Sequence, residues 1–337
     1  MEFYTKIKKM NFFYSDKYKK CVSNKFCNNY IIYGNNIFLK ENSILNILKL
    51  ANKFNFNNTI RIMVDNTFKF EMISNFIKEN DLFIKKKTII LTVIKQYHKI
   101  LFKNINRLIN LLNKNIFLII KSDKLDKIDC FLIKKTKIQV NLINCNTPIG
   151  IYLHKWIKKR IKELKFNLNY KIIKLLCYYY EGNILALNQI LKIISLISLT
   201  KSLNILNIKK IIFDQALFHP SQWSESLLYG NYTRSIHILK QLFKNKYSPI
   251  TLIRFLQNDL LILIIIKRFK QNIKEILSIN NYYIYNIRKL FFNKIINLLD
   301  NKKIYLILKF LIKIELMIHK ENNEKIVWLH LKILSTF

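Results

Sequence analysis

The sequence predicts an α/β domain at the N-terminal end, followed by two domains built from helices alone. The first observation is that strand-like runs alternate with helical patterns over about the first 145 residues, which is typical of a mainly parallel sheet covered by helices. The second is that strand patterns stop at Thr147-Pro148, with a further break at Phe218-His219-Pro220. A chain of 337 residues is also long enough for more than one core. We therefore expect domains over 1–146, 147–213 and 214–337.

Strands in the first domain are predicted from short apolar runs. The run at 30–33 ends at Gly34, and the helix that follows carries an apolar stripe between 44 and 51. Buried parallel strands appear in a sequence as continuous apolar stretches, whereas a half-buried strand alternates apolar and polar residues. On these grounds three further strands are expected at 88–94, 116–120 and 138–142.

Helices in the remainder are predicted from apolar residues that recur at helical spacing. Between 153 and 164 the apolar residues share one face of a helix. Four lysines fill the opposite face: Lys155, Lys158, Lys159 and Lys162. Further helices are expected at 172–180, 223–228, 234–242, 249–267, 284–299 and 304–319.

The turn Glu181-Gly182-Asn183 separates two of these helices. Gly182 can adopt the left-handed conformation that commonly ends a helix, because it has no Cβ atom. Asn183 can then cap the helix that begins at Ile184, because its side-chain oxygen can accept a hydrogen bond from a free backbone N–H group.

The chain carries a formal net charge of +38, which usually indicates a nucleic acid or an anionic membrane as partner. The chain is also rich in Asn, Ile, Tyr and Phe, which like Lys have A/T-rich codons, so genomic drift can produce part of this charge without selection for binding. Arg, which is best suited to bidentate contacts with bases and phosphates, is sparse beside Lys. A general lysine-rich nucleic-acid-binding protein is the alternative function, and it predicts tight, salt-sensitive binding to duplex DNA.

No segment has the pattern expected of a transmembrane helix or a signal peptide. The longest charge-free run, 138–154, contains three asparagines, a proline and a glycine. The N-terminal segment 1–13 mixes charged and aromatic residues. The five cysteines include no C-x-x-C pair, so neither a disulfide framework nor a zinc module is indicated. We therefore expect a cytoplasmic protein with no membrane partner.

An α/β domain that opens with a strand, a glycine and a helix invites comparison with a phosphate-binding loop. Such a loop needs several glycines, a Lys for the terminal phosphates and a Ser or Thr for Mg²⁺. Here the turn reads Gly34-Asn35-Asn36-Ile37-Phe38-Leu39-Lys40, and the whole chain has four glycines. The strand at 116–120 runs into Lys121-Ser122-Asp123 instead of an acidic pair that could hold a metal. We therefore expect no nucleotide cofactor and no ATP hydrolysis by this chain.

Patterns for metal binding and for nucleophilic catalysis are missing as well. The six histidines fall in no metal-binding spacing, and neither a G-x-S-x-G motif nor a Cys/His signature occurs. Lysines interleave with Asp123, Asp126 and Asp129, so charge pairing and the helix dipole explain this cluster better than a metal site. An autonomous ATPase or polymerase would need such groups. The sequence therefore predicts a protein that works by binding macromolecules, without catalytic residues or metal ligands.

The most specific motifs lie in the last third of the chain. Phe218-His219-Pro220-Ser221-Gln222-Trp223 is followed in order by Leu227-Leu228-Tyr229-Gly230, Arg234 and Pro249. This stretch resembles the C-terminal collar domain of the delta subunits of the bacterial DNA polymerase III clamp loader. Shorter segments resemble the same family in the same order along the chain, at Tyr33-Gly34-Asn35, 180–187 and Val327-Trp328.

The resemblance implies a fold, partners and a role. The fold is a degenerate ATPase-like (AAA+ or RecA-like) parallel-sheet domain, a small helical lid domain and a helical collar domain. The implied partners are the beta sliding clamp, the gamma/tau and delta prime subunits of the loader, and primer-template DNA within the assembled complex. Members of this family open the clamp while neighbouring subunits hydrolyse ATP, which agrees with the missing phosphate loop.

The resemblance places the clamp contact at Leu82 and Phe83, a hydrophobic wedge at the end of a helix in the first domain. Two adjacent apolar side chains at a helix end can fill a pocket on a partner, each contributing about 1.5–3 kcal/mol when buried. Asn80 replaces a further apolar contact of the family. From the residue pattern alone, packing of both side chains on their own sheet is the simpler interpretation, whereas the resemblance favours the clamp contact. The helix itself has a predicted buried stripe of Met72, Ile73, Phe76 and Ile77.

Candidate DNA contacts lie between 282 and 288, where the family can present an aromatic side chain toward DNA. Tyr282, Tyr283 and Tyr285 precede Arg288, and aromatic residues beside a basic one can stack on unpaired bases. Tyrosines at this density also suit packing inside the collar, so both interpretations stay open. The candidate nucleic-acid-binding residues are Tyr283, Tyr285 and Arg288.

Overall fold

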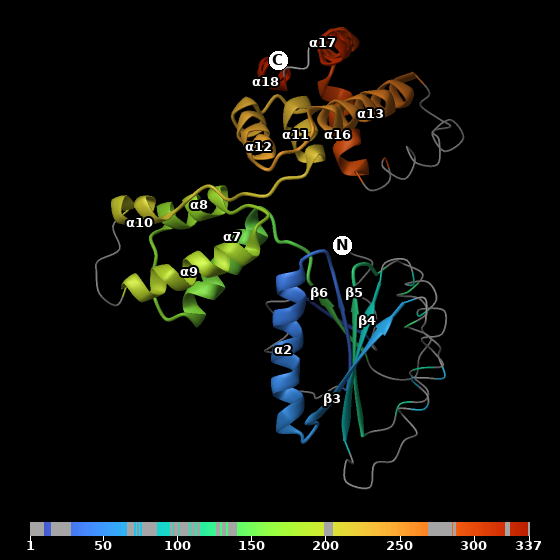
Figure 1. Cartoon of the computed structure of the whole chain (residues 1–337), viewed down its shortest axis with the longest axis vertical. Helices are drawn as coiled ribbons and strands as arrows, with labels where there is room; N and C mark the ends of the chain where they lie inside the picture. The colour runs from blue at the N-terminus through green and yellow to red at the C-terminus, as the bar shows by residue number, and fades with distance from the viewer. Residues whose placement is uncertain are drawn as a thin grey trace. The chain divides into compact units, whose positions relative to one another are not determined.

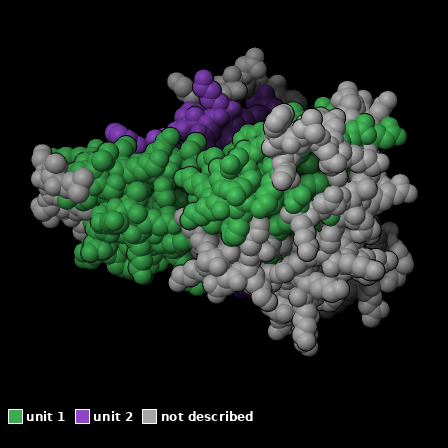
Figure 2. Space-filling model, turned by 90° about the horizontal axis from the view of Figure 1, so that it is seen from below, with its two compact units in different colours: residues 1–177, 183–212 green, residues 178–182, 213–337 purple. Residues whose placement is uncertain are grey.

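The computed structural model divides into two compact units, which are coloured in Figure 2. Unit 1 comprises Met1–Cys177 and Asn183–Ile212, and unit 2 comprises Tyr178–Gly182 and Phe213–Phe337. The structure describes 10–14, 28–65, 86–94, 115–125, 140–198, 205–268, 288–320 and 324–335, with the single residues 71, 73, 75, 97, 101, 108, 112, 129, 133 and 285.

Unit 1 contains a six-stranded sheet whose neighbouring strands are all parallel, in the order β1-β6-β2-β5-β4-β3 (Figure 1). The central strands are buried along almost their whole length, as expected for a parallel sheet covered by other elements. The strands are β1 (Met10–Tyr14), β2 (Asn29–Tyr33), β3 (Asn58–Val64), β4 (Lys87–Val93), β5 (Ile116–Ser122) and β6 (Val140–Asn144).

Helix α2 (Ile37–Lys53) covers one face of the sheet, where it packs against β2 and β5 (Figure 1). Its buried residues recur every three or four positions, which places them on one side of the helix. Beneath it Tyr30 stacks on Phe117 with 5.4 Å between ring centroids, and Phe56 packs against the same ring at 5.6 Å. The other face of the sheet has a separate apolar core that includes Ile31, Leu118 and Leu142.

The described helices of unit 1 that follow the sheet begin with α7 (Ile151–Glu163), α8 (Tyr170–Tyr179) and α9 (Ile184–Ser198). A shorter helix, α10 (Ile205–Ile211), follows these three. Helix α7 packs against α9, and the Nε group of Arg160 donates a hydrogen bond of 2.8 Å to the Asn188 side chain across that contact.

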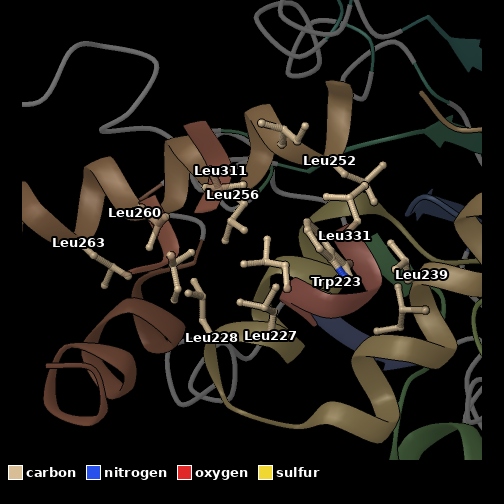
Figure 3. Close-up of a cluster of buried hydrophobic side chains, with 14 of the residues drawn as sticks. Trp223, Leu227, Leu228, Leu239, Leu252, Leu256, Leu260, Leu263, Leu311 and Leu331 are labelled. Atoms are coloured by element: carbon tan, nitrogen blue, oxygen red, sulfur yellow. The ribbon is translucent and has the colours of Figure 1, made fainter. Parts of the chain in front are cut away.

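Unit 2 is helical around one large apolar core (Figure 3). Leucines from one side of α13 point toward Trp223, Leu227 and Leu228 of α11. Among the described residues, α13 alone is long and apolar enough to cross a membrane by length and composition, which the sequence analysis did not single out, but half of that window is buried in the protein. The helices are α11 (Pro220–Leu228), α12 (Tyr232–Lys244), α13 (Pro249–Arg268), α16 (Lys289–Leu298), α17 (Asn301–Lys320) and α18 (Glu324–Leu334).

The predicted fold class is confirmed, including the strands at 30–33, 88–94, 116–120 and 138–142. Strands β1 and β3, which form the two edges of the sheet, were not predicted from the sequence. Strand β3 is only partly buried, so its sequence lacks the continuous apolar run that marks the central strands. Residues of β3 alternate between partly buried and exposed, and that period of two could have revealed it. The predicted division into three domains stays a prediction.

Candidate functional site

The turn after β2 stands where a phosphate-binding loop would lie in an ATPase-like domain. Gly34 has a φ angle of 140°, and a Cβ atom built on it would lie 2.3 Å from the backbone carbon of Cys145. No side chain fits at this position, because the turn packs directly against the backbone that follows β6. Glycine is therefore required here for contact between two protein segments, without any need for a ligand.

Two asparagines join this turn to the segment after β6. The backbone N–H of Asn35 donates to the Asn146 side chain at 3.1 Å, and the Thr147 N–H donates to the Asn35 side chain at 2.9 Å. The Asn36 N–H donates to the Cys145 carbonyl at 3.2 Å. The Asn36 side chain also caps α2 by accepting from the Leu39 N–H at 3.0 Å. Backbone N–H groups that would surround a phosphate in a functional loop are thus bound to protein oxygens.

The lysine of this turn is also bound within the protein. Lys40 is buried and its Nζ group lies 2.5 Å from a carboxylate oxygen of Asp123, while Lys121 pairs with Glu41 beside it. Burial raises the pKa of the neighbouring Cys145 thiol to about 11, so this group stays protonated at neutral pH. Lys40 and Asp123 stand in the places of a phosphate-binding lysine and a metal-binding acid. Because they form an ion pair, each neutralises the charge of the other.

Within the carboxylate cluster, Asp123 forms an ion pair with Lys40 of α2, whereas the predicted pairing with the lysines of the cluster stays a prediction. Asp129 is buried, and Asp126 lies outside the described residues. Within the part of the chain that the structure describes, no three His, Cys, Asp or Glu side chains lie close enough together to hold a metal ion.

The predicted clamp-contact residues Leu82 and Phe83 lie outside the described residues, as do Met72, Phe76, Ile77 and Asn80. Ile73 is described and is fully buried in the core that includes β4, as expected for a member of the predicted apolar stripe. The assignment of the clamp contact to Leu82 and Phe83 stays a prediction.

Of the candidate DNA contacts, Tyr282 and Tyr283 lie outside the described residues. Tyr285 is buried against Phe292, with 5.9 Å between ring centroids. Arg288 binds Glu225 of α11 at 2.8 Å and Asp259 of α13 at 2.6 Å. These groups have partners within the collar, and their contact with DNA stays a prediction.

Arg288 and Asp259 form the centre of a buried polar cluster in unit 2. The pKa of Asp259 is raised from its ordinary value, because burial outweighs the opposing effects of the Arg288 charge and of a 2.5 Å hydrogen bond from Ser224. Burial and the charge of Arg288 also lower the pKa of His219. The neutral ring of His219 suits its position at the start of α11, where Nδ1 accepts a hydrogen bond from the Ser221 N–H and Gln222 completes a capping box.

The end of α8 and the residues Glu181-Gly182 belong to unit 2 and are bound there by backbone hydrogen bonds, which the sequence pattern did not predict. The Gln215 N–H donates to the Tyr179 carbonyl at 2.9 Å, and the Leu217 N–H donates to the Glu181 carbonyl at 2.8 Å. Glu181 also forms a two-point ion pair with Arg234 of α12, at 2.6 and 3.0 Å. The left-handed Gly182, with φ of 80°, and the Asn183 cap on α9 are as predicted.

Two family models match this chain, one in each unit. The model described as "DNA polymerase III, delta subunit" matches residues 30–146. The model described as "Processivity clamp loader gamma complex DNA pol III C-term" matches residues 220–337, which begin at the first residue of α11. Together they cover the sheet from Tyr30 onward, which leaves out β1, and the helices from α11 to α18.

Curated proteins and a solved structure agree with these models. The chain is 35% identical over 320 residues to the DNA polymerase III subunit delta of Buchnera aphidicola subsp. Acyrthosiphon pisum, covering 94% of this chain and 95% of that protein. Identity to the Escherichia coli subunit delta is 27%, covering 91% and 90% of the two chains. The Bacillus subtilis DNA clamp loader delta protein has the same fold, with a TM-score of 0.51, 13% identity and coverage of 95% and 98%. The chain therefore belongs to the family of DNA polymerase III delta subunits, which are components of the clamp loader.

Proposed function

We propose that this clamp-loader subunit binds the beta sliding clamp through Leu82 and Phe83 and opens it for loading onto primed DNA, without hydrolysing ATP itself. The observation that carries the proposal is the occupied turn after β2. Its N–H groups bind the segment after β6, and Lys40 is neutralised by Asp123, so this turn is not free to hold the phosphates of ATP. The work of this subunit is then mechanical binding, while ATP is hydrolysed by neighbouring subunits.

The other partners follow from membership of the clamp loader. Helix α17 of the collar exposes Tyr305, Ile312 and Leu316 at a spacing that places them on one side of the helix. Exposed apolar side chains in such a stripe fit packing against another helical protein. This face supports assembly with the gamma/tau and delta prime subunits in a cytoplasmic complex that receives primer-template DNA.

A pull-down with the purified sliding clamp tests the wedge. Leu82→Ala with Phe83→Ala should remove clamp binding, because two buried side chains contribute about 3–6 kcal/mol together, a loss of at least 100-fold in affinity. The matched control is Leu45→Ala with Phe54→Ala, which removes the same two residue types from exposed positions of the same domain. The control should bind normally, and both variants should keep the native circular dichroism spectrum.

Clamp binding that is unchanged in the Leu82→Ala, Phe83→Ala variant would show that these two side chains do not form the clamp contact.

The part of the proposal that concerns ATP is tested separately by measuring ATP turnover. The purified chain with Mg²⁺ and ATP should release no phosphate above the buffer rate and show no thermal stabilisation. ATP turnover by the chain alone would contradict this part of the proposal.

A further inference from the structure

The exposed face of α7 is the most strongly basic surface among the described helices of unit 1. Between 147 and 198 the sequence contains nine Lys and Arg residues against two acidic ones, a net charge of +7. Both acidic residues have arginine partners, since Glu163 binds Arg160 and Glu181 binds Arg234. The positive charge of this segment is therefore left largely without internal compensation.

Helical geometry gathers this charge on one side of α7. Lys155, Lys158 and Lys162 are exposed at positions i, i+3 and i+7, directly opposite the buried Trp156 and Ile157. With a rise of about 1.5 Å per residue, the three lysines span about 10 Å along the helix. One strand of duplex DNA places a phosphate about every 3.4 Å along its axis, so the span matches about three phosphates.

The N-terminal end of α7 adds to the positive electrostatic potential of the three lysines. No acidic residue occupies its first turn, and Gly150 provides no side-chain cap. The space beside Gly150 is open, since a Cβ atom built there would meet nothing within 4 Å. The positive end of the helix dipole therefore reinforces the lysines. Tyr152 is exposed beside them, with Lys155 Nζ 5.9 Å from its ring centroid.

Lysines on α17 provide a contrast. Lys302, Lys309 and Lys313 are also exposed along one side of their helix, at positions i, i+7 and i+11. That helix exposes the apolar stripe of Tyr305, Ile312 and Leu316 between them, which suits contact with protein. The exposed face of α7 has Ile151 and Tyr152 at its N-terminal end, but lysines alone recur along the rest of that face, which suits a polyanion.

We propose that the α7 face, defined by Lys155, Lys158 and Lys162, binds the sugar-phosphate backbone of the DNA onto which the clamp is loaded. This inference deepens the proposed function, because the DNA is the primer-template substrate of that reaction. Lysine contacts of this kind recognise phosphates without reading sequence, so the face contributes affinity and orientation on any primed site.

Fluorescence anisotropy with a labelled primer-template duplex tests the proposal on the full-length chain. The test variant carries Lys155→Glu, Lys158→Glu and Lys162→Glu, and the matched control carries Lys302→Glu, Lys309→Glu and Lys313→Glu. Both lose the same net charge from exposed helical positions. We expect the α7 variant to bind at least tenfold more weakly at about 0.1 M salt, with a salt slope reduced by about 2.7 for three phosphate contacts. The control should change affinity by less than about threefold, because lysines that do not contact phosphate contribute only through the general charge of the chain, which salt screens.

Three results would overturn the proposal. Equal weakening in both variants would mean that the charge acts diffusely, and absence of measurable binding by the wild-type chain at low salt would mean that no such site exists. An α7 variant that binds DNA normally but fails to assemble with the other loader subunits would assign the face to a protein partner. Replacement of the same three lysines by Arg should preserve DNA binding. The α7 variant should also bind the clamp normally, so that failure here and failure of the clamp-contact proposal are distinguishable.

Discussion

Gly182 and Gly230 are both in the left-handed conformation, with φ angles of 80° and 69°. They differ in what lies next to them. A Cβ atom on Gly182 would lie 2.1 Å from the Leu217 carbonyl oxygen, whereas a Cβ atom on Gly230 would have nothing within 4 Å. The first glycine is needed for conformation and for space, the second for conformation alone.

Substitution of these two glycines separates the two requirements. Gly230→Ala should lower the free energy of unfolding by about 1 kcal/mol, because only the left-handed conformation is penalised. Gly182→Ala should cost about 3 kcal/mol or more, because the backbone must also move away from Leu217. Urea denaturation monitored by circular dichroism measures both losses. Equal losses in the two variants would contradict the close contact between Gly182 and Leu217.

The sequence predicted the conformation at this turn but not its neighbour. Glycine followed by asparagine at the end of a helical pattern indicates a left-handed residue and a new cap, because both are local properties. The contact with Leu217 joins residues 35 positions apart in the chain. No local pattern encodes which distant backbone segment closes over a glycine.

At the scale of helices, Arg288 connects elements that its sequence context does not reveal. Its side chain is 13% exposed and binds α11 through Glu225 and α13 through Asp259, which is 1% exposed. Its guanidinium group also lies 4.5 Å from the Phe291 ring centroid. The adjacent aromatic and basic residues in the sequence suggested Arg288 as a DNA contact. The structure adds a second role for it, as the partner of a buried carboxylate.

Replacement of Arg288 tests this second role. Arg288→Leu should lower the free energy of unfolding by about 3–5 kcal/mol at neutral pH, because Asp259 is then left buried without its cation. Arg254→Leu is the control, since Arg254 is 62% exposed where it pairs with Glu315, and an exposed pair of this kind contributes about 0–1 kcal/mol. Chemical denaturation of both variants gives the comparison.

The double variant Arg288→Leu with Asp259→Leu provides a further check. It should recover part of the lost stability, because it removes the buried charge that the single variant leaves unpaired. A decrease of less than about 1 kcal/mol in the free energy of unfolding of Arg288→Leu alone would show that the ion pair contributes little to stability.

At the scale of the whole molecule, the boundary between the two units does not follow a single cut in the sequence. Tyr178–Gly182, which comprises the end of α8 and the turn after it, belongs to unit 2, although pattern alone assigns these residues to the lid domain. Its backbone pairs with the segment that leads into the collar, through the amides of Gln215 and Leu217. A collar fragment cut at the predicted boundary of 214 therefore loses these bonds.

Hydrogen exchange measures this effect. In the intact chain the amides of Gln215 and Leu217 should be protected, whereas in a fragment of residues 214–337 they should exchange at least tenfold faster, because their acceptors are missing. The Ser235 amide, which donates to the Asn231 carbonyl within the collar, is the internal control and should stay protected in both. Equal protection of all three amides in the fragment would show that the segment 178–182 is dispensable for the collar.

The sequence by itself determined the fold class, the central strands and most collar helices, because local periodicity specifies them. It also determined the family, because the family's motifs occur in order along the chain. It also indicated that the phosphate loop is missing, because glycine content and acidic residues can be read directly. Only the tertiary structure showed how the turn after β2 is occupied by the segment after β6, how Lys40 is neutralised and how Arg288 is bound. These contacts join residues far apart in the chain, and their partners are selected by the geometry of packing, which no local pattern specifies.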